Sequence, residues 1–264
     1  MNRRLVIFLI LMQFSFVFAQ DQFTGIVQYD FIVHNKNDLS FANPYELYFN
    51  TTISLYEKID NPKKNVSKKN NNTTDSEGRM ISNKKLKSNL PPPFYYSNTR
   101  NKELIFRENV ISKMYFVKDA LEPIPWKLQQ EHKKIANYNC QKATAKYRGR
   151  EYTVWFTTEI PVSHGPWKLR GLPGLILEVT EETGKYGFVA NAVNLNPDKE
   201  LLQKKLKKPD IEGITTMENY IEAIKNKYEN TMAMARASLP RGARLATDCD
   251  VCPDPKNYSL ERFD

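Results

Sequence analysis

Residues 141–157 read QKATAKYRGREYTVWFT and contain two alternating runs separated by a turn. In the second run Tyr152, Val154 and Phe156 share one face, because successive side chains in a strand point to opposite sides. The glycine of Arg148-Gly149-Arg150 favours a tight reversal between the runs. The stretch therefore predicts an antiparallel β-hairpin.

Similar runs extend this pattern in both directions along the chain. The predicted strands are residues 23–33, 46–56, 103–106, 113–117, 175–180 and 186–193. Because the last two runs are joined by a short turn rather than by a helical crossover, they indicate a meander and not βαβ units. We therefore expect a mainly β, α+β fold: a curved antiparallel meander sheet, half-barrel-like, with one or two C-terminal helices packed on it.

Two helical segments are predicted near the end of the domain. Residues 201–208 form a short basic run that Pro209 stops. A longer helix begins at the capping box formed by Thr215 and Glu218. Its apolar stripe consists of Met217, Tyr220, Ile221, Ile224 and Tyr228. That spacing predicts one helix face packed on the sheet.

Residues 1–19 predict export. Arg3 and Arg4 precede an apolar run at 5–18, and Ala19 supplies a small residue before Gln20. This is the pattern of a cleavable secretory signal peptide, and the apolar run is too short to span a bilayer. We expect cleavage near Ala19/Gln20, no lipid attachment, no membrane span, and a periplasmic or secreted location.

The net charge of +9 is concentrated in one segment. Eight basic but only two acidic residues lie between 61 and 90, and three prolines follow at 91–93. So few apolar residues cannot offset the conformational entropy lost when the segment is ordered, and we therefore expect a disordered insertion at 61–93. We interpret it as a solvated loop rather than as a polybasic arm that binds a partner. The remaining chain is almost neutral, which argues against nucleic-acid binding. We expect one domain over 20–238, followed by an irregular tail at 239–264.

A dense group of motifs lies between Pro125 and Val179. It consists of Trp126-Lys127-Leu128, Cys140-Gln141-Lys142-Ala143-Thr144, Gly149-Arg150-x-Tyr152, Trp155-Phe156-Thr157, Gly165-Pro166-Trp167-Lys168 and Gly171-Leu172-Pro173-Gly174-Leu175-Ile176. In this order the motifs closely resemble the GLPGLI family of exported proteins of Gram-negative bacteria, which takes its name from the last string. With the strands near Gly25 and at Leu47–Phe49, the resemblance covers most of the mature chain except the basic insertion. It supplies no catalytic residues, because the family has no established activity.

The string at 171–176 predicts a tight corner that leads into a buried strand. Pro173 fixes its own φ and keeps Leu172 out of the α region, and Gly174 suits the positive φ of a type II turn. Leu175 then begins the core strand. This structural role is the simplest interpretation of the string.

Four side chains near this corner are candidates for the rim of a ligand-binding groove: Trp155, His164, Trp167 and Arg170. Aromatic rings offer contact area, and an arginine can clamp a carboxylate or a phosphate. Each tryptophan by itself is more often a core residue. The alternative is therefore a purely structural corner without a ligand.

No catalytic residue, cofactor site or metal site is predicted. The histidines of the mature chain show no metal-binding spacing, and neither a nucleophile elbow nor a phosphate-binding glycine loop is present. A hydrolase that acts through carboxylates near Glu159 and Glu178 is an alternative. It requires both carboxylates in one pocket with perturbed pKa values.

Cys140, Cys249 and Cys252 form an odd set of cysteines. In an oxidising compartment we expect a disulfide between Cys249 and Cys252, or one from Cys140 to the tail. A thiol-redox or metal-handling role for Cys249 and Cys252 is a further alternative. Pro253 follows the motif directly, where a thioredoxin-like site would open a helix, and additional zinc ligands are not evident.

The function that the sequence favours is that of a non-enzymatic periplasmic binding or accessory protein. The concave side of the sheet would hold an apolar ligand, a peptide or a segment of a partner. Members of the GLPGLI family look like frequent neighbours of outer-membrane TonB-dependent receptors, so the resemblance implies such a receptor or another envelope protein as the partner. A deep apolar concavity would favour ligand binding, whereas a filled core would leave only surfaces.

Overall fold

The computed structural model describes the sheet, two helices and a short segment near the end of the chain. The described residues are 23–34, 39–59, 73–74, 80–82, 90–110, 113–227, 229–230, 233, 237–238 and 259–263. The predicted signal peptide, the Cys249–Cys252 motif and most of the basic insertion lie outside these residues.

Within the described chain, 13 strands form one sheet. They are β1 (Gly25–His34), β2 (Leu39–Phe49), β3 (Ile53–Lys58), β4 (Thr73–Thr74), β5 (Met80–Ser82), β6 (Phe94–Asn98), β7 (Glu103–Val110), β8 (Lys113–Ala120), β9 (Lys127–Ile135), β10 (Tyr138–Tyr147), β11 (Arg150–Thr157), β12 (Leu175–Glu181) and β13 (Tyr186–Asn194). The order along the sheet is β8-β7-β6-β3-β2-β1-β13-β12-β11-β10-β9, with β4 and β5 off this path. The helices are α2 (Lys199–Lys205) and α3 (Met217–Lys225).

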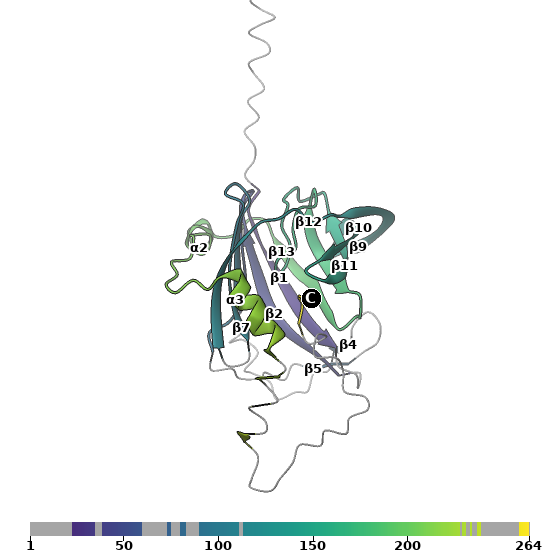
Figure 1. Ribbon diagram of the computed structural model, residues 1–264. Coiled ribbons are helices and arrows are strands. Elements are labelled where there is room, and N and C mark those ends of the chain that lie inside the picture. Colours follow the sequence, from purple (N-terminus) through teal and green to yellow (C-terminus); the bar gives the residue numbers. More distant parts are fainter. Residues whose placement is uncertain are drawn as a thin grey trace, which may run out of the picture.

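The sheet consists of two meanders joined by its first and last strands. β1 pairs antiparallel with both β2 and β13, so that Val27 lies between Leu47 and Val193. Hairpins extend the sheet outward to β8 at one edge and to β9 at the other. The strands curve around an interior without closing into a ring (Figure 1). The predicted curved antiparallel sheet is therefore confirmed.

The sheet buries apolar side chains on both faces. Leu47 belongs to the larger core cluster and the adjacent Tyr48 to a smaller one, because neighbours in a strand point to opposite faces. Leu202 and Leu206 cover the smaller cluster from α2. The larger cluster lies on the enclosed face and includes Tyr220 of α3. The two helices thus pack on opposite sides of the sheet.

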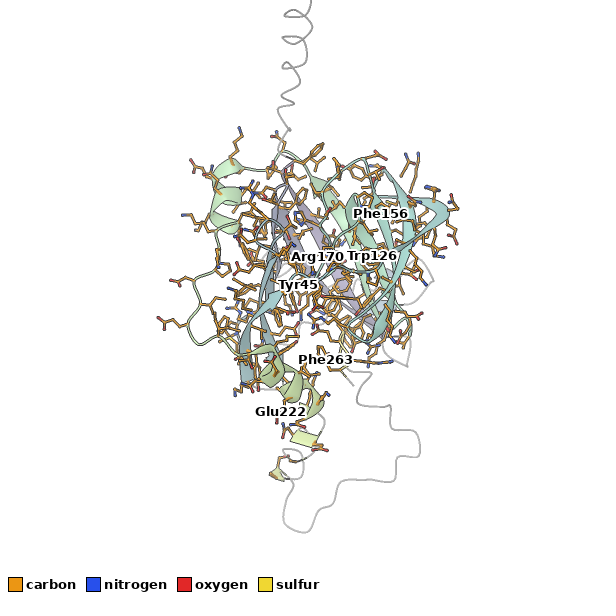
Figure 2. The ribbon with its side chains drawn as sticks, turned by 45° about the horizontal axis from the view of Figure 1, so that its top comes forward. Tyr45, Trp126, Phe156, Arg170, Glu222 and Phe263 are labelled. Atoms are coloured by element: carbon orange, nitrogen blue, oxygen red, sulfur yellow. The ribbon has the colours of Figure 1, made fainter. Side chains whose placement is uncertain are left out.

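The loop between β11 and β12, residues 158–174, folds back under the enclosed face. The N–H of Ile176 donates to the carbonyl oxygen of His164 at 3.0 Å, which ties the loop to the strand that follows it. The indole Nε1 of Trp126 donates to the carbonyl oxygen of Arg170 at 2.8 Å. Figure 2 shows Trp126 and Arg170 between the two halves of the sheet. This loop fills part of the space that the curved sheet encloses.

The string at 171–176 forms a corner, but not the predicted type II turn. Gly171 has a φ of +93°, whereas Gly174 has no positive φ. Gly174 is required instead by a close approach, because a Cβ atom there would lie 2.1 Å from the carbonyl oxygen of Thr157. The corner does lead into a buried strand, since β12 begins at Leu175 with three buried residues.

The single strand predicted at 46–56 is wrong. β2 ends at Phe49 and β3 begins at Ile53. Between them the side-chain Oδ1 of Asn50 accepts the N–H groups of Thr52 at 2.9 Å and of Ile53 at 2.7 Å. This turn reverses the chain, although the alternation of side chains continues through it in the sequence. The hairpins β10–β11 and β12–β13, in contrast, confirm the strands predicted there.

Helix α3 begins one residue later than the predicted capping box. Thr216 is the N-cap, and its hydroxyl accepts the N–H of Asn219 at 3.3 Å. The N–H of Thr215, which the Glu218 side chain would accept in the predicted capping box, instead donates to the carbonyl oxygen of Phe116 in β8 at 2.7 Å. Tyr220 on the predicted apolar stripe is fully buried. Among the described helices, neither is long and apolar enough to cross a membrane.

Part of the insertion that was predicted to be disordered, 61–93, is ordered. β4 and β5 lie inside it, and β5 pairs parallel with β2. The carbonyl oxygen of Pro92 accepts Nε of Arg107 at 2.9 Å, and that of Pro93 accepts the N–H of Lys58 at 3.3 Å. Hydrogen bonds to the neighbouring sheet therefore hold the polyproline stretch, which composition alone does not indicate.

Candidate binding site

The four predicted groove residues do not line an open groove. His164 is 1% exposed, Trp167 5% and Arg170 8%. Both terminal nitrogens of the Arg170 guanidinium donate to backbone carbonyl oxygens, at 2.7 Å to Lys168 and at 2.9 Å to Glu122. Trp155 lies apart on β11, half-buried, with the Lys133 ammonium 4.5 Å from its ring centroid. The 158–174 loop buries three of the four because it runs under the sheet and not along its rim.

The interior beside these residues is filled. Ser54, Ser97, His164, Lys168 and Arg170 line a cavity of about 10 Å³. A volume of this size holds one water molecule at most. Nε2 of His164 donates to the carbonyl oxygen of Asn50 at 2.9 Å, and burial lowers the pKa of His164 to about 4. The deep apolar concavity that would favour an enclosed ligand is therefore not found here.

The residues that complete the enclosed face belong to a short segment, residues 259–263, which we call the docked segment. Its backbone is held by the β10–β11 hairpin. Nε of Arg150 donates to the carbonyl oxygen of Ser259 at 2.8 Å, and the Tyr152 hydroxyl donates to that of Leu260 at 2.6 Å. The N–H of Arg262 donates in turn to the carbonyl oxygen of Arg148 at 2.8 Å. Main-chain atoms of three of the five residues, Ser259, Leu260 and Arg262, are thus hydrogen-bonded to the hairpin.

Gly149 at the hairpin turn permits this close approach. Its φ is +74°, and a Cβ atom there would lie 2.2 Å from the carbonyl oxygen of Arg262. A side chain at position 149 would therefore clash with the docked segment in the observed conformation of the turn. The turn glycine that predicts the hairpin also forms a surface against which another stretch of backbone lies.

One side chain of the docked segment, Glu261, enters the interior and is only 2% exposed. Its two carboxylate oxygens accept Nζ of Lys168 at 3.0 and 2.9 Å. Nε of Arg148 lies 3.7 Å from Glu261 Oε1, and the Tyr220 hydroxyl lies 3.3 Å from Oε2. The Lys168 side chain is itself fully buried. The centre of the site is therefore a buried ammonium–carboxylate pair.

Aromatic rings surround the Lys168 ammonium. Nζ lies 3.6 Å from the ring centroid of Phe106, 5.3 Å from that of Tyr220, 5.5 Å from that of Trp167 and 5.8 Å from that of Tyr95. The faces of such rings attract cations, and the attraction increases where water is excluded. The rings therefore replace part of the hydration that the ammonium loses on burial.

A second carboxylate, that of Glu108 in β7, lies 3.6 Å from Nζ of Lys168. It accepts hydrogen bonds from the hydroxyls of Tyr95, at 2.7 Å, and of Tyr220. Burial opposes its ionisation, but Lys168 and these hydroxyls hold the pKa of Glu108 below its usual range. Burial raises the pKa of Glu261 even though Lys168 acts against the shift. Two unlike carboxylates thus share one cation.

The backbone next to Lys168 is strained. Trp167 has a φ of +57°, a conformation that bulky residues rarely adopt and that costs about 1–3 kcal/mol. Its ring packs against Tyr147 and Tyr152, with centroid separations of 6.0 and 5.9 Å. Such strain persists only where the surrounding contacts determine the conformation. Here those contacts come from the same hairpin that holds the docked segment.

A second buried ion pair lies next to the turn of the hairpin. Nη1 of Arg150 lies 2.8 Å from Oε2 of Glu181, and both side chains are fully buried. Glu181 also accepts the backbone N–H groups of Thr183, at 3.1 Å, and Lys185, at 2.8 Å. Burial acts against ionisation, but these hydrogen bonds and Arg150 lower the pKa of Glu181. Arg150 is therefore held by Glu181 at the same time as it contacts Ser259.

The carboxylates of the predicted hydrolase alternative have other partners. Oε1 of Glu159 accepts the N–H of Asn139 at 2.8 Å, and Oε1 of Glu178 pairs with Nζ of Lys133 at 2.6 Å. Neither contacts the Lys168 cluster. Glu108, Lys168 and Glu261 were not among the predicted site residues. A signal was present, because Lys168 stands within the apolar run that surrounds the 171–176 string.

Cys140 is a free thiol in the core, fully buried in β10. Burial raises the pKa of this thiol to about 11. It therefore forms no bond to the tail in this structure. The alternative bond, between Cys249 and Cys252, falls on residues outside the described ranges and stays a prediction.

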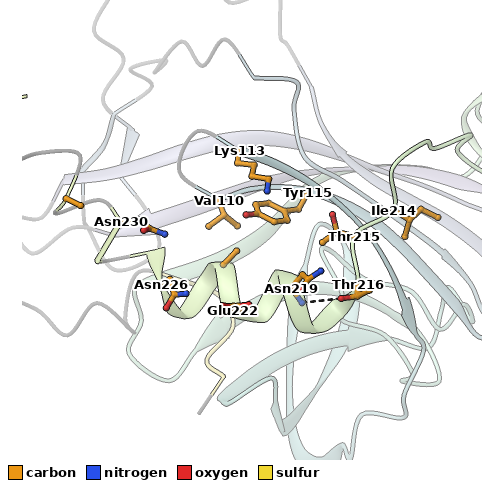
Figure 3. Close-up of a pocket in the computed structure, with 12 residues that line it drawn as sticks. Val110, Lys113, Tyr115, Ile214, Thr215, Thr216, Asn219, Glu222, Asn226 and Asn230 are labelled. Carbon is orange, nitrogen blue, oxygen red and sulfur yellow. Dashed lines mark hydrogen bonds between the residues drawn. The ribbon is translucent and has the colours of Figure 1, made fainter. Parts of the chain in front are cut away.

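A second and more open pocket lies between α3 and the edge strand β8, with a volume of about 810 Å³ (Figure 3). Its wall includes Lys113 and Tyr115 from the strand and Asn219, Glu222 and Asn226 from the helix. These polar groups are spread along the helix and do not converge on one point. The pocket lacks the buried, oriented charge that distinguishes the Lys168 cluster.

Comparisons with known proteins give a family match over a short part of the chain and a similar fold in solved structures. The model of a family described as "Protein of unknown function (Porph_ging)" matches residues 146–178. No curated protein matches the chain. Two solved structures of PNGF-II, in the P21 and C2 space groups, are 20% identical to this chain and cover 78% of it, with TM-scores of 0.49 and 0.50. This chain spans 34% and 33% of their respective lengths, about a third. The structure in the C2 space group thus shows a similar fold over most of this chain.

Proposed function

We propose that this protein is an exported, non-enzymatic binding or accessory protein of the cell envelope, which holds an extended polypeptide segment against the enclosed face of its sheet. The pattern of residues 1–19 supports export, and the motifs ending at 171–176 support membership of the GLPGLI family. The observation that carries the proposal is the docked segment, whose main chain and one carboxylate are bound by the β10–β11 hairpin and Lys168.

The contacts are of a kind that suits polypeptide recognition. Two carbonyl oxygens and one N–H of the docked segment are bound, and every polypeptide carries these groups. Domains that bind extended peptides often obtain affinity from the main chain and specificity from pockets for single side chains. Lys168 provides such a pocket for Glu261. The partner that fits the family resemblance is an outer-membrane TonB-dependent receptor or another envelope protein.

A non-enzymatic role is favoured because the two carboxylates near Lys168 have little space beside them. The adjoining cavity of about 10 Å³ admits a water molecule but no substrate. Glu108 and Glu261 are held by Lys168 and Tyr220, which stabilises a fixed arrangement of charges. In this arrangement the cluster acts as an anchor for a chain segment.

The test is capture of a partner by the full exported chain after cross-linking in intact cells. Three versions are compared: wild type, Lys168→Met combined with Glu261→Gln, and Lys142→Met. The double variant removes both members of the buried pair, whereas Lys142 pairs with Glu131 outside the site. We expect wild type and Lys142→Met to yield one envelope polypeptide cross-linked within residues 148–152, and the double variant to lose it. Equal capture by all three, or no cross-linked envelope polypeptide, would contradict the proposal.

A further inference from the structure

The docked segment occupies the site that the proposed function assigns to a partner. We infer that residues 259–263 compete for this site within the same chain, and that the ligand they exclude is an acidic segment of another polypeptide. This inference rests on the proposed function, because it requires the enclosed face to bind polypeptide segments. It adds the chemistry of the ligand and a way in which binding is regulated.

A segment of another polypeptide can reproduce the main-chain contacts of the docked segment. The three main-chain hydrogen bonds, to Ser259, Leu260 and Arg262, do not depend on which side chains the segment carries. Gly149 leaves room for the passing backbone of any residue. The hairpin surface is therefore selective for an extended chain rather than for this particular sequence.

The position that Glu261 occupies beside Lys168 favours a carboxylate. Lys168 is fully buried, and Glu108 lies 3.6 Å away, which is longer than a hydrogen bond. Glu261 provides the close contacts, at 3.0 and 2.9 Å. A segment with a neutral side chain at this point would leave the buried ammonium with Glu108 alone, and the two close hydrogen bonds to a carboxylate would be lost, which is unfavourable. The competing ligand must therefore carry Asp or Glu at the corresponding position.

The flanking residues indicate what surrounds that acidic residue. Leu260 packs against the main core cluster. Nη1 of Arg262 lies 3.1 Å from Oε1 of Glu182, so a basic residue at this position of the ligand would pair with Glu182. The ring of Phe263 lies 5.9 Å from the Arg148 guanidinium. The ligand class is thus an extended segment with the order apolar, acidic, basic, aromatic.

The tether makes the competition effective. A segment that belongs to the same chain as its binding site reaches an effective concentration there on the order of 1 mM. If the segment alone binds with a Kd of about 10 μM, the apparent Kd of an identical segment added from outside rises about 100-fold. A partner then binds only when it has a better segment or a high local concentration, which would keep the site closed until the partner is present.

The experiment uses a fluorescein-labelled synthetic peptide with the sequence of residues 257–264, NYSLERFD, and full-length protein. Fluorescence anisotropy is measured with wild type, Glu261→Gln and the matched control Glu131→Gln, whose carboxylate pairs with Lys142 outside the site. Hydrogen exchange of the Arg262 amide, which donates to Arg148, reports whether the docked segment is released.

We expect Glu261→Gln to speed exchange at Arg262 and to bind the peptide at least about tenfold more tightly than wild type, because its own segment competes less. Glu131→Gln should behave as wild type, and a peptide with glutamine in place of Glu261 should bind to none of them. Equal affinity of wild type and Glu261→Gln would overturn the competition while leaving the proposed function intact. If the segment is released but the peptide binds no version at millimolar concentration, the proposed function fails. If Glu261→Gln leaves the amide protected, Glu261 does not hold the segment and the ligand assignment is wrong.

Discussion

Replacement of Lys168 by methionine removes the cation from the centre of the site but keeps a long side chain in its place. Two carboxylates then lose their shared partner. Glu261 is 2% exposed, and its oxygens lie 3.0 and 2.9 Å from Nζ of Lys168 in the native protein. Glu108 retains the hydroxyls of Tyr95 and Tyr220. Most of the cost is therefore expected at Glu261.

The expected loss of stability is large. Removal of one member of a buried ion pair costs about 3–5 kcal/mol, because the remaining charge is left in a medium of low polarity. For a domain of this size, each kcal/mol lowers Tm by about 2–4 °C, so the melting temperature should fall by about 6–20 °C. The carboxyl can also take up a proton, so the loss should be smaller near pH 5 than near pH 8.

The assay is a double-mutant cycle with Glu261→Gln, followed by urea denaturation with tryptophan fluorescence as the signal. Trp167 adjoins Lys168 and is buried, so its emission reports on this region. We expect the double variant to be more stable than the sum of the two single losses by about 0.5–3 kcal/mol, since contacting residues couple. Lys142→Met, in an exposed pair, should leave the midpoint almost unchanged. Additive losses, or a Lys168→Met variant as stable as Lys142→Met, would refute the reasoning.

Three further predictions follow from single residues. Burial lowers the pKa of His164 to about 4 from an ordinary 6.5, so the stabilisation present above pH 6.5 should decrease by about 3 kcal/mol as the pH falls to 4. His164→Gln should flatten this part of the plot of urea midpoint against pH. An unchanged slope would exclude His164 as its cause. Gly174→Ala should cost more than about 3 kcal/mol because its Cβ would lie 2.1 Å from the Thr157 carbonyl oxygen, whereas Gly184→Ala, with a φ of +67° but open space, should cost about 1–2 kcal/mol in the same unfolding measurement. Cys140 should resist a thiol reagent at pH 8 until the protein unfolds, because the thiol is buried and its pKa is raised to about 11. Cys140→Ser should lower the number of thiols that react in denaturant by one and leave the number that react in the native protein unchanged.

The sheet could be predicted from the sequence where one face of a strand is buried and the other is not. The hairpin at 141–157 shows this alternation, because Tyr152, Val154 and Phe156 are buried while Glu151, Thr153 and Trp155 before them are more exposed. β9 was missed for the opposite reason: it is an edge strand with mostly exposed polar side chains and carries no such pattern. The turn at Asn50 was missed because the apolar alternation passes through it, and only a side-chain hydrogen bond marks the reversal.

The site could not be predicted, because its charges meet only in the folded chain. Lys168 and Glu261 are separated by 93 positions, and Glu108 comes from a different half of the sheet. Glu108 and Glu261 stand beside polar and charged residues in the sequence, as residues of a solvated surface do, and only Lys168 stands within an apolar run. Their burial depends on pairing, and pairing between distant positions leaves no periodic pattern in a single sequence. Trp155, His164, Trp167 and Arg170 were selected for their proximity in sequence to the corner, which does not determine their exposure.

The 171–176 string, on which the family resemblance rests, and Lys168, the centre of the proposed site, lie close together in the chain between β11 and β12. Gly174 closes the base of the 158–174 loop against Thr157, and Gly165 lies so close to Ile176 that a Cβ atom would be 2.9 Å away. The loop closed in this way presents Trp167 with a positive φ and Lys168 with a fully buried ammonium. Both features cost free energy, and a loop selected for stability alone would carry neither a strained tryptophan nor a buried lysine at these positions. Gly165 and Gly174 therefore help to hold Lys168 where it meets the carboxylate of the docked segment, and under the proposed function the 171–176 string would serve binding as well as the corner that it forms.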